Sequence, residues 1–124
     1  MSRERRAYPR YPVEFPLQVT VAGDDAAEAV TTYPARAGTL SRTSLEISCN
    51  ADLVTALLRQ RQLPYACGVA FSLDQDFAFR AQVITHRRRS QHRYVLVLLF
   101  VHEDALLEQA LERSLQGNQS VGLD

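Results

Sequence analysis

The stretch VEFPLQVTV, residues 13–21, places an apolar side chain at every second position. A period of two is the pattern of a β-strand with one buried face, and it is clearest here. Pro16 has no N–H to donate to a sheet, so it predicts a strand start, an edge or a bulge. Turn-forming residues follow at 23–25, and residues 29–40 are therefore expected to pair back on the first strand.

Further alternating stretches lie at residues 45–49, 67–73 and 77–83, and a continuous apolar stretch follows at 94–101. The last is apolar on both faces, so we expect it to lie between the core and a covering helix. Six short strands separated by turns predict a closed barrel. The expected fold class is therefore mainly all-β: a six-stranded antiparallel β-barrel with a short helix and a C-terminal amphipathic helix.

Two helices are expected beside these strands. Asn50 is a favoured N-cap residue for a short helix that ends before Pro64. The face that this helix is expected to bury carries Leu53, Leu57 and Leu58. The second helix is expected over residues 104–115. Its apolar stripe consists of Leu107, Ala110, Leu111 and Leu115.

The composition fits one small domain: 124 residues, 46% of them apolar, with 14 basic and 14 acidic side chains. Every basic side chain is an arginine, and over half lie in two tracts, residues 3–10 and 87–93. A neutral total disfavours a general polyanion binder, but a local arginine cluster can hold a small anionic ligand. We expect a flexible, arginine-rich ligand-binding segment (1–12), the barrel with its C-terminal helix (13–116) and a polar tail (117–124).

The longest apolar run, residues 95–101, is far shorter than the roughly 20 residues of a membrane helix. The first residues are charged and contain no apolar signal segment. We therefore expect a cytoplasmic protein with no membrane insertion. Cys49 and Cys67 are expected to be reduced core thiols.

The second basic tract, residues 86–93, is expected to be a solvated hairpin loop between the last two strands. A functional alternative makes it a further phosphate contact or a partner surface, with His86 flanking the ligand. The spacing of His86, His92 and His102 does not suit a metal site. Since no nucleophile has a recognisable His and acid partner, we predict no catalytic residues, no cofactor and no enzyme activity.

Arg6 and Arg10 stand four residues apart in a segment that Pro9 and Pro12 keep out of a helix. A guanidinium group can grip phosphate oxygens or the O6 and N7 edge of guanine, and its flat face can stack on a purine. This segment therefore predicts an anionic nucleotide as ligand. The alternative is a solvated basic tail.

The turn GTLSRTSLEI, residues 38–47, is rich in hydroxyl side chains that can offer donors and acceptors to a base edge. The alternative is an ordinary polar turn, in which Ser and Thr bond their own backbone.

With the strand plan and the final helix, these two elements resemble the PilZ domain family of bacterial cyclic di-GMP receptors over about residues 5–115. The family's Arg-x-x-x-Arg motif is met by Arg6 and Arg10, and Arg5 matches an extra preceding arginine that is often seen. The second motif, Asp/Asn-x-Ser-x-x-Gly, retains only its central serine. Its three positions are occupied here by Thr39, Ser41 and Ser44.

The resemblance implies that the arginines hold guanine and phosphate groups of an intercalated ligand dimer, while the second motif grips a guanine edge. A carboxylate makes charge-assisted bonds of roughly 1.5–3 kcal/mol, whereas the neutral hydroxyl of Thr39 contributes nearer 1 kcal/mol. Ser44 in place of glycine adds roughly 1–2 kcal/mol if its position needs a positive φ. Together these departures predict binding weakened by more than tenfold.

The leading hypothesis is a receptor whose N-terminal segment becomes ordered over the barrel when cyclic di-GMP binds. The altered surface then acts on a partner protein, of unknown identity, in motility, pilus or biofilm control. One alternative is a PilZ-like adaptor that no longer binds the nucleotide and acts only by protein contacts. Another is a binder of single-stranded nucleic acid, against which the zero net charge counts. We expect no nucleic-acid partner.

Overall fold

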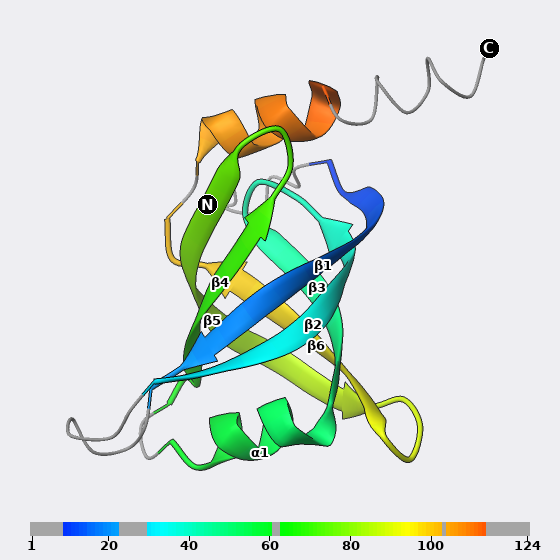
Figure 1. Ribbon diagram of the computed structural model, residues 1–124, viewed down its shortest axis with the longest axis vertical. Coiled ribbons are helices and arrows are strands. Elements are labelled where there is room, and N and C mark those ends of the chain that lie inside the picture. The colour runs from blue at the N-terminus through cyan, green and yellow to red at the C-terminus, as the bar shows by residue number, and fades with distance from the viewer. Residues whose placement is uncertain (1–8, 23–29, 61–62, 103, 114–124) are drawn as a thin grey trace, which may run out of the picture.

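The computed structural model describes residues 9–22, 30–60, 63–102 and 104–113. Six antiparallel strands close into a barrel in the order β1-β2-β3-β6-β5-β4, as Figure 1 shows. The strands are β1 (Tyr11–Val21), β2 (Thr31–Leu40), β3 (Ser44–Asn50), β4 (Ala66–Ser72), β5 (Asp76–Arg88) and β6 (Arg93–Phe100). The predicted fold class is confirmed, and β1 begins two residues earlier than the alternation indicated.

The barrel core consists of the inward-facing residues of this alternation. The fully buried strand side chains include Val19, Leu40, Leu45, Ile47, Cys49, Leu96 and Leu98. Burying an aliphatic side chain of this size contributes roughly 1.5–3 kcal/mol relative to leaving it exposed. Burial of the side chains at alternate strand positions is therefore the main source of the barrel's stability.

The two neighbours of β1 pair with it very unequally. Strand β2 pairs along almost all of β1, but β4 pairs only with Gln18, Val19 and Thr20. Pro16 lies in the part of β1 that pairs with β2 alone, next to a register irregularity between Pro12 and Phe15. The predicted edge or bulge at Pro16 is confirmed.

Helix α1 (Ala51–Leu58) lies across one end of the barrel, the lower end in Figure 1. Asn50 is its N-cap, and the Oδ1 atom of Asn50 accepts a hydrogen bond from the backbone N–H of Asp52 at 3.2 Å. The helix buries Leu53, Val54 and Leu57, while Leu58 is 48% exposed. The prediction that Leu58 shares the buried face is wrong, because at 100° per residue it lies beyond the edge of that face.

A second helix, residues 105–113, closes the opposite end of the barrel (Figure 1). Leu107, Ala110 and Leu111 are buried in the barrel core, as predicted. The predicted stripe residue Leu115 and the tail 117–124 lie outside the described residues.

Two ion pairs hold this helix to neighbouring loops. Arg113 Nε donates to Asp74 Oδ2 at 2.6 Å, and Arg42 Nη1 lies 3.5 Å from Glu108 Oε1. The hydrogen bond from Arg113 is the main cause of a lowered pKa for Asp74. Both pairs place the helix over the barrel end.

The outer face of β6 is therefore not covered as the sequence led us to expect. Leu99, on that face, is 41% exposed, and the C-terminal helix packs on the end of the barrel instead. The prediction of a helix over this strand is wrong.

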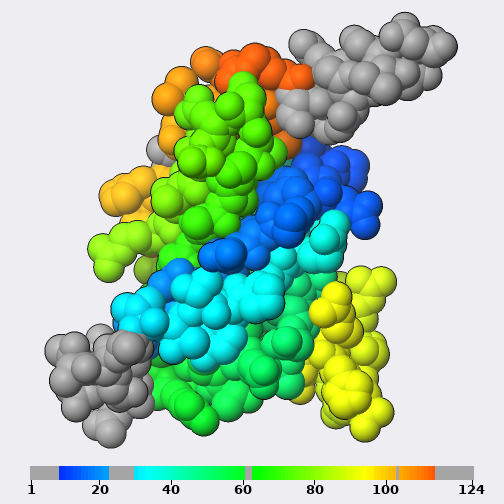
Figure 2. All heavy atoms as spheres, viewed as in Figure 1, coloured from blue at the N-terminus to red at the C-terminus, as the bar shows by residue number. Residues whose placement is uncertain are grey.

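The second basic tract also differs from its predicted form. Strand β5 continues through Arg88 and β6 begins at Arg93, so residues 89–92 alone form the loop. This hairpin projects from the body of the molecule, as the yellow segment in Figure 2 shows. The prediction of a loop over 86–93 is therefore wrong at its two ends, because polar residues continue the strand pairing there.

None of the helices in the described part of the chain combines the length and apolar character that spanning a bilayer requires.

Cys49 and Cys67 are free thiols and both are buried, as predicted. Burial raises the pKa of each thiol to about 11. In the unfolded chain these thiols ionise near pH 9, so their contribution to stability is complete below pH 9 and is lost as the pH rises to about 11.

We therefore expect the free energy of unfolding to fall between pH 9 and 11 by up to about 1.4 kcal/mol per pH unit for each thiol. Urea denaturation under reducing conditions at pH 8, 9 and 10 measures this. A Cys49→Ala/Cys67→Ala variant is the control, because it keeps every other alkaline titration. An equal decline in both proteins would contradict the assignment to the thiols.

Candidate ligand-binding site

A pocket of about 220 Å³ lies on the outer face of the barrel wall formed by β2, β3, β6 and β5. Its lining residues are Arg10, Thr39, Thr43, Ser44, Glu46, Ile84, Val97 and Leu99. Three of the residues predicted from the sequence, Arg10, Thr39 and Ser44, thus meet at one place. Arg5 and Arg6 lie outside the described residues.

The strand register explains why these residues meet. Glu46 of β3 is paired with Thr39 of β2 on one side and with Val97 of β6 on the other. Ser44 of β3 is paired with Leu99 of β6. Since paired residues point to the same face of a sheet, polar groups from β2 and β3 adjoin apolar ones from β6.

The floor of the pocket is apolar and open to solvent. Ile84 is 54% exposed and Leu99 is 41% exposed, and Val97 lies half-buried beside them. A surface of this kind can receive the flat face of a base. The sequence signal for it was the run at 94–101, apolar on both faces, whose outer half we had assigned to a helix contact.

Ser41 holds the turn that forms one rim of the pocket. Its side chain is buried, and its Oγ atom accepts hydrogen bonds from the backbone N–H groups of Thr43 and Ser44, each at 3.1 Å. Its own N–H donates to the carbonyl of Ser44 at 2.9 Å. Ser41 therefore shapes the turn through local backbone bonds, as the polar-turn alternative described.

Ser44 is not strained. Among the described residues no residue other than glycine has a positive φ, and Ser44 is the first residue of β3. The cost that a positive φ would impose on a serine therefore does not arise. The hydroxyl of Ser44 lies 3.0 Å from that of Ser41, so the two are hydrogen-bonded on the rim.

Replacing Ser41 by alanine is expected to destabilise the protein by about 1–2 kcal/mol, because the part-buried N–H groups of Thr43 and Ser44 lose their acceptor. Ser90→Ala, the same substitution at an exposed serine of the β5–β6 loop, is the control, with an expected change below about 0.5 kcal/mol. Urea denaturation of both variants measures the difference. Equal stabilities would show that the Ser41 hydroxyl does not hold the turn.

Arg10 supplies the pocket's positive charge. It is exposed and directly precedes β1. In the part of the chain that the structure describes, the ion pairs are Arg42–Glu108 and Arg113–Asp74, and Arg10 belongs to neither. Its guanidinium group is therefore available to an anionic ligand.

The next row of cross-strand pairs on the same outer face of the barrel contains two more arginines. Ser48 of β3 is paired with Arg36 of β2 and with Val95 of β6, and Val95 in turn is paired with Arg87 of β5. Both arginines are exposed. A row lies two residues, or roughly 7 Å, from the next, so Arg36 and Arg87 extend the positive surface beyond Arg10.

Neither Arg36 nor Glu46 was a candidate site residue on sequence grounds, whereas Arg87 lies in the tract 86–93, for which a phosphate contact was the functional alternative. The alternation already placed Glu46 on an outer face, but only the pairing of distant strands shows what it faces. His86, the residue expected to flank the ligand, is paired with Leu96 and is not a lining residue of this pocket.

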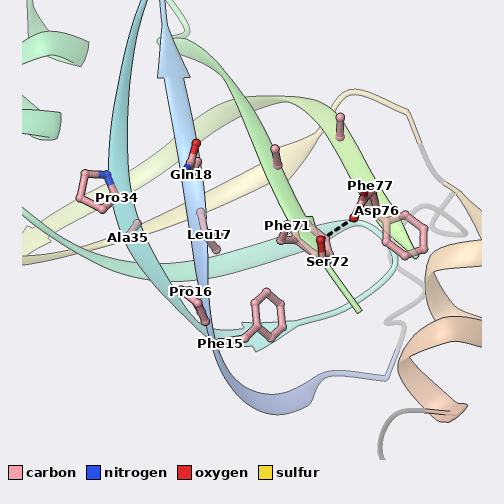
Figure 3. Close-up of a pocket in the computed structure, with 12 residues that line it drawn as sticks. Phe15, Pro16, Leu17, Gln18, Pro34, Ala35, Phe71, Ser72, Asp76 and Phe77 are labelled. Atoms are coloured by element: carbon pink, nitrogen blue, oxygen red, sulfur yellow. Dashed lines mark hydrogen bonds between the residues drawn. The ribbon is translucent and has the colours of Figure 1, made fainter. Parts of the chain in front are cut away.

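A larger recess, about 700 Å³, lies where β1 and β4 separate (Figure 3). It is mainly apolar, with the rings of Phe15 and Phe71 packed 5.3 Å apart. Its acidic group is Asp76, whose Oδ1 accepts a hydrogen bond from Ser72 Oγ at 2.5 Å. No arginine is among the described residues that line this recess, so it suits an anionic ligand less well than the Arg10 pocket does.

A third recess, about 470 Å³, contains Arg80 beside Thr20 and Gln82. The described residues that line this recess include no carboxylate and none of the hydroxyl-rich turn. Arg80 is therefore a matched control for Arg10. Within the residues that the structure describes, no three His, Cys, Asp or Glu side chains gather where a metal ion could bind.

The described residues of the candidate site thus combine an apolar floor, the guanidinium group of Arg10, the carboxylate of Glu46 and a hydroxyl-bearing rim. Arginine with a carboxylate around a flat apolar surface is chemistry suited to a purine nucleotide. Comparison of the chain with protein-family models, with curated proteins and with solved structures finds no match.

Proposed function

We propose that this protein is a non-enzymatic receptor for cyclic di-GMP and that the ligand binds at the Arg10 pocket. The observation that carries the proposal is the meeting of Arg10, Thr39 and Ser44 around an exposed apolar floor. These residues come from three separate segments of the chain. Their resemblance to the PilZ motifs supports the choice of ligand.

The size of the pocket supports a particular pose. A volume of about 220 Å³ is below the roughly 300–1,000 Å³ of sites that enclose a drug-sized ligand. The pocket therefore receives one guanine base, whose face lies on Val97 and Leu99. The rest of the dinucleotide extends over the neighbouring surface.

The phosphates are expected to meet the arginines of this face. Arg10 is at the pocket, and Arg36 and Arg87 lie in the next row. Arg5 and Arg6 are proposed to complete the grip because of their spacing from Arg10. In this proposal the bound ligand draws the N-terminal segment onto the barrel and changes the surface offered to a protein partner in the bacterial cytoplasm.

Calorimetric titration of the purified full chain with cyclic di-GMP tests the proposal. We expect saturable binding, and an Arg80→Ala variant, altered at the third recess, should bind equally well. A single-stranded oligonucleotide of equal phosphate concentration should not compete. No heat and no thermal shift at millimolar cyclic di-GMP would overturn the proposal.

The second candidate function is an adaptor that acts only through protein contacts. It is favoured by the neutral Thr39 and by the size of the apolar recess between β1 and β4. This alternative predicts no nucleotide binding together with a stable complex with another protein. Substituting Phe15, which lines that recess, should then weaken the complex, whereas substituting Arg10 should not.

A further inference from the structure

We infer that Glu46 is the residue by which this site selects guanine over adenine. The inference rests on the proposed function, since it concerns the base that occupies the Arg10 pocket. It adds a specificity-determining residue that neither the motif spacing nor the resemblance indicated.

The carboxylate of Glu46 lies at the polar edge of the pocket. Thr39 Oγ1 donates to Glu46 Oε1 at 3.4 Å, a long hydrogen bond across the β2–β3 pair. Of the two ion pairs between described residues, Glu46 takes part in neither. A carboxylate offers about four acceptor positions, so most of its accepting capacity is left for a ligand.

The backbone beside Glu46 keeps this carboxylate open. The register of β2 with β3 is irregular between Ala37 and Thr39, where Gly38 lies. A Cβ atom at Gly38 would lie 3.7 Å from Glu46 Oε1, an ordinary van der Waals contact, so glycine leaves unoccupied the space next to the carboxylate that a side chain would take. Glycine at this position leaves it accessible from the β2 side.

The opposite side of Glu46 adjoins the pocket floor. Val97 is paired with Glu46, so the two side chains stand next to each other on the outer face. A base lying flat on Val97 therefore presents one of its edges to the carboxylate. Charge-assisted hydrogen bonds in such a partly shielded site are roughly twice as strong as neutral ones.

The edges of the two purines differ in what they offer a carboxylate. Guanine has two adjacent donors, N1–H and the N2 amino group, which match the two carboxylate oxygens. Adenine has one donor, its N6 amino group, beside N1, an acceptor that a carboxylate repels. Glu46 thus favours guanine by attraction and rejects adenine by repulsion, which are the two components of specificity.

The test compares cyclic di-GMP, cyclic di-AMP and cyclic di-IMP on the native chain and on Glu46→Gln. The native chain is expected to bind cyclic di-GMP at least 10-fold more tightly than cyclic di-AMP, with cyclic di-IMP between them because it lacks the N2 amino group. Glu46→Gln should lose about 10-fold or more in affinity for cyclic di-GMP. Its affinity for cyclic di-AMP should be retained or increased, because a glutamine amide can both accept from and donate to adenine.

Glu14→Gln is the matched control, since Glu14 is exposed on β1 and does not line the pocket. Equal melting temperatures of the three proteins would show that the substitutions leave the fold intact. Native binding with unchanged selectivity in Glu46→Gln would overturn the role of Glu46 and leave the proposed receptor function standing. If the native chain binds none of the three dinucleotides, both fail.

Discussion

Replacing Arg10 by alanine is expected to weaken the binding of cyclic di-GMP by about 10- to 100-fold without changing the melting temperature. Hydrogen bonds from a charged group contribute about 1.5–3 kcal/mol, and Arg10 is the guanidinium that lines the pocket itself. Its exposure and its position before β1 mean that the core loses nothing. Calorimetry at physiological ionic strength measures the change.

Two further variants separate the geometry of Arg10 from its charge. Arg10→Lys keeps the charge but loses the planar fork, so it should recover only part of the affinity. Arg80→Ala removes an arginine from a different recess and should bind as the native chain does. Equal losses in Arg10→Ala and Arg80→Ala would indicate a general charge effect rather than a site at Arg10.

Replacing Leu107 by alanine is expected to lower the free energy of unfolding by about 2–5 kcal/mol, because it removes a large buried side chain and leaves a cavity. Leu107 is completely buried where the C-terminal helix meets the core. Its neighbour Leu106 is 54% exposed on the same helix and is the matched control. Leu106→Ala should change stability by less than about 0.5 kcal/mol.

Urea denaturation of the two leucine variants measures this difference. The same substitution at adjacent positions keeps helix propensity constant, so the difference reports burial alone. If both variants lost the same small amount, the helix would not close the barrel in solution. The comparison thus tests the part of the fold that the sequence placed wrongly.

The sequence predicted the barrel because its evidence is local. In residues 13–21 the inward and outward positions follow from alternation alone, and Asn50 caps a helix with its own side chain. The free, buried thiols were predictable for the same reason, since Cys49 and Cys67 continue the apolar alternation of their strands. Each of these features depends on residues close together in the chain.

The site was only partly predictable because it depends on register between distant strands. Arg10 and Thr39 were chosen from motif spacing, and they line one pocket. Glu46 adjoins the pocket floor because it is paired with Val97, which lies 51 positions away in the chain. No local pattern specifies that pairing. The helix over β6 was expected because an apolar outer face favours a covering element, whereas Leu99 on that face is 41% exposed and the helix packs on the end of the barrel.

The strand order has a thermodynamic consequence for the proposed receptor. Strands β1 to β3 and β4 to β6 are two successive meanders, joined by a long seam between β3 and β6 and a short seam between β1 and β4. The pocket straddles the long seam, with Glu46 on one meander and Val97 on the other. In the proposed receptor, a ligand bound there would hold the two halves of the chain together, so occupancy and cohesion of the barrel would be linked and each would strengthen the other.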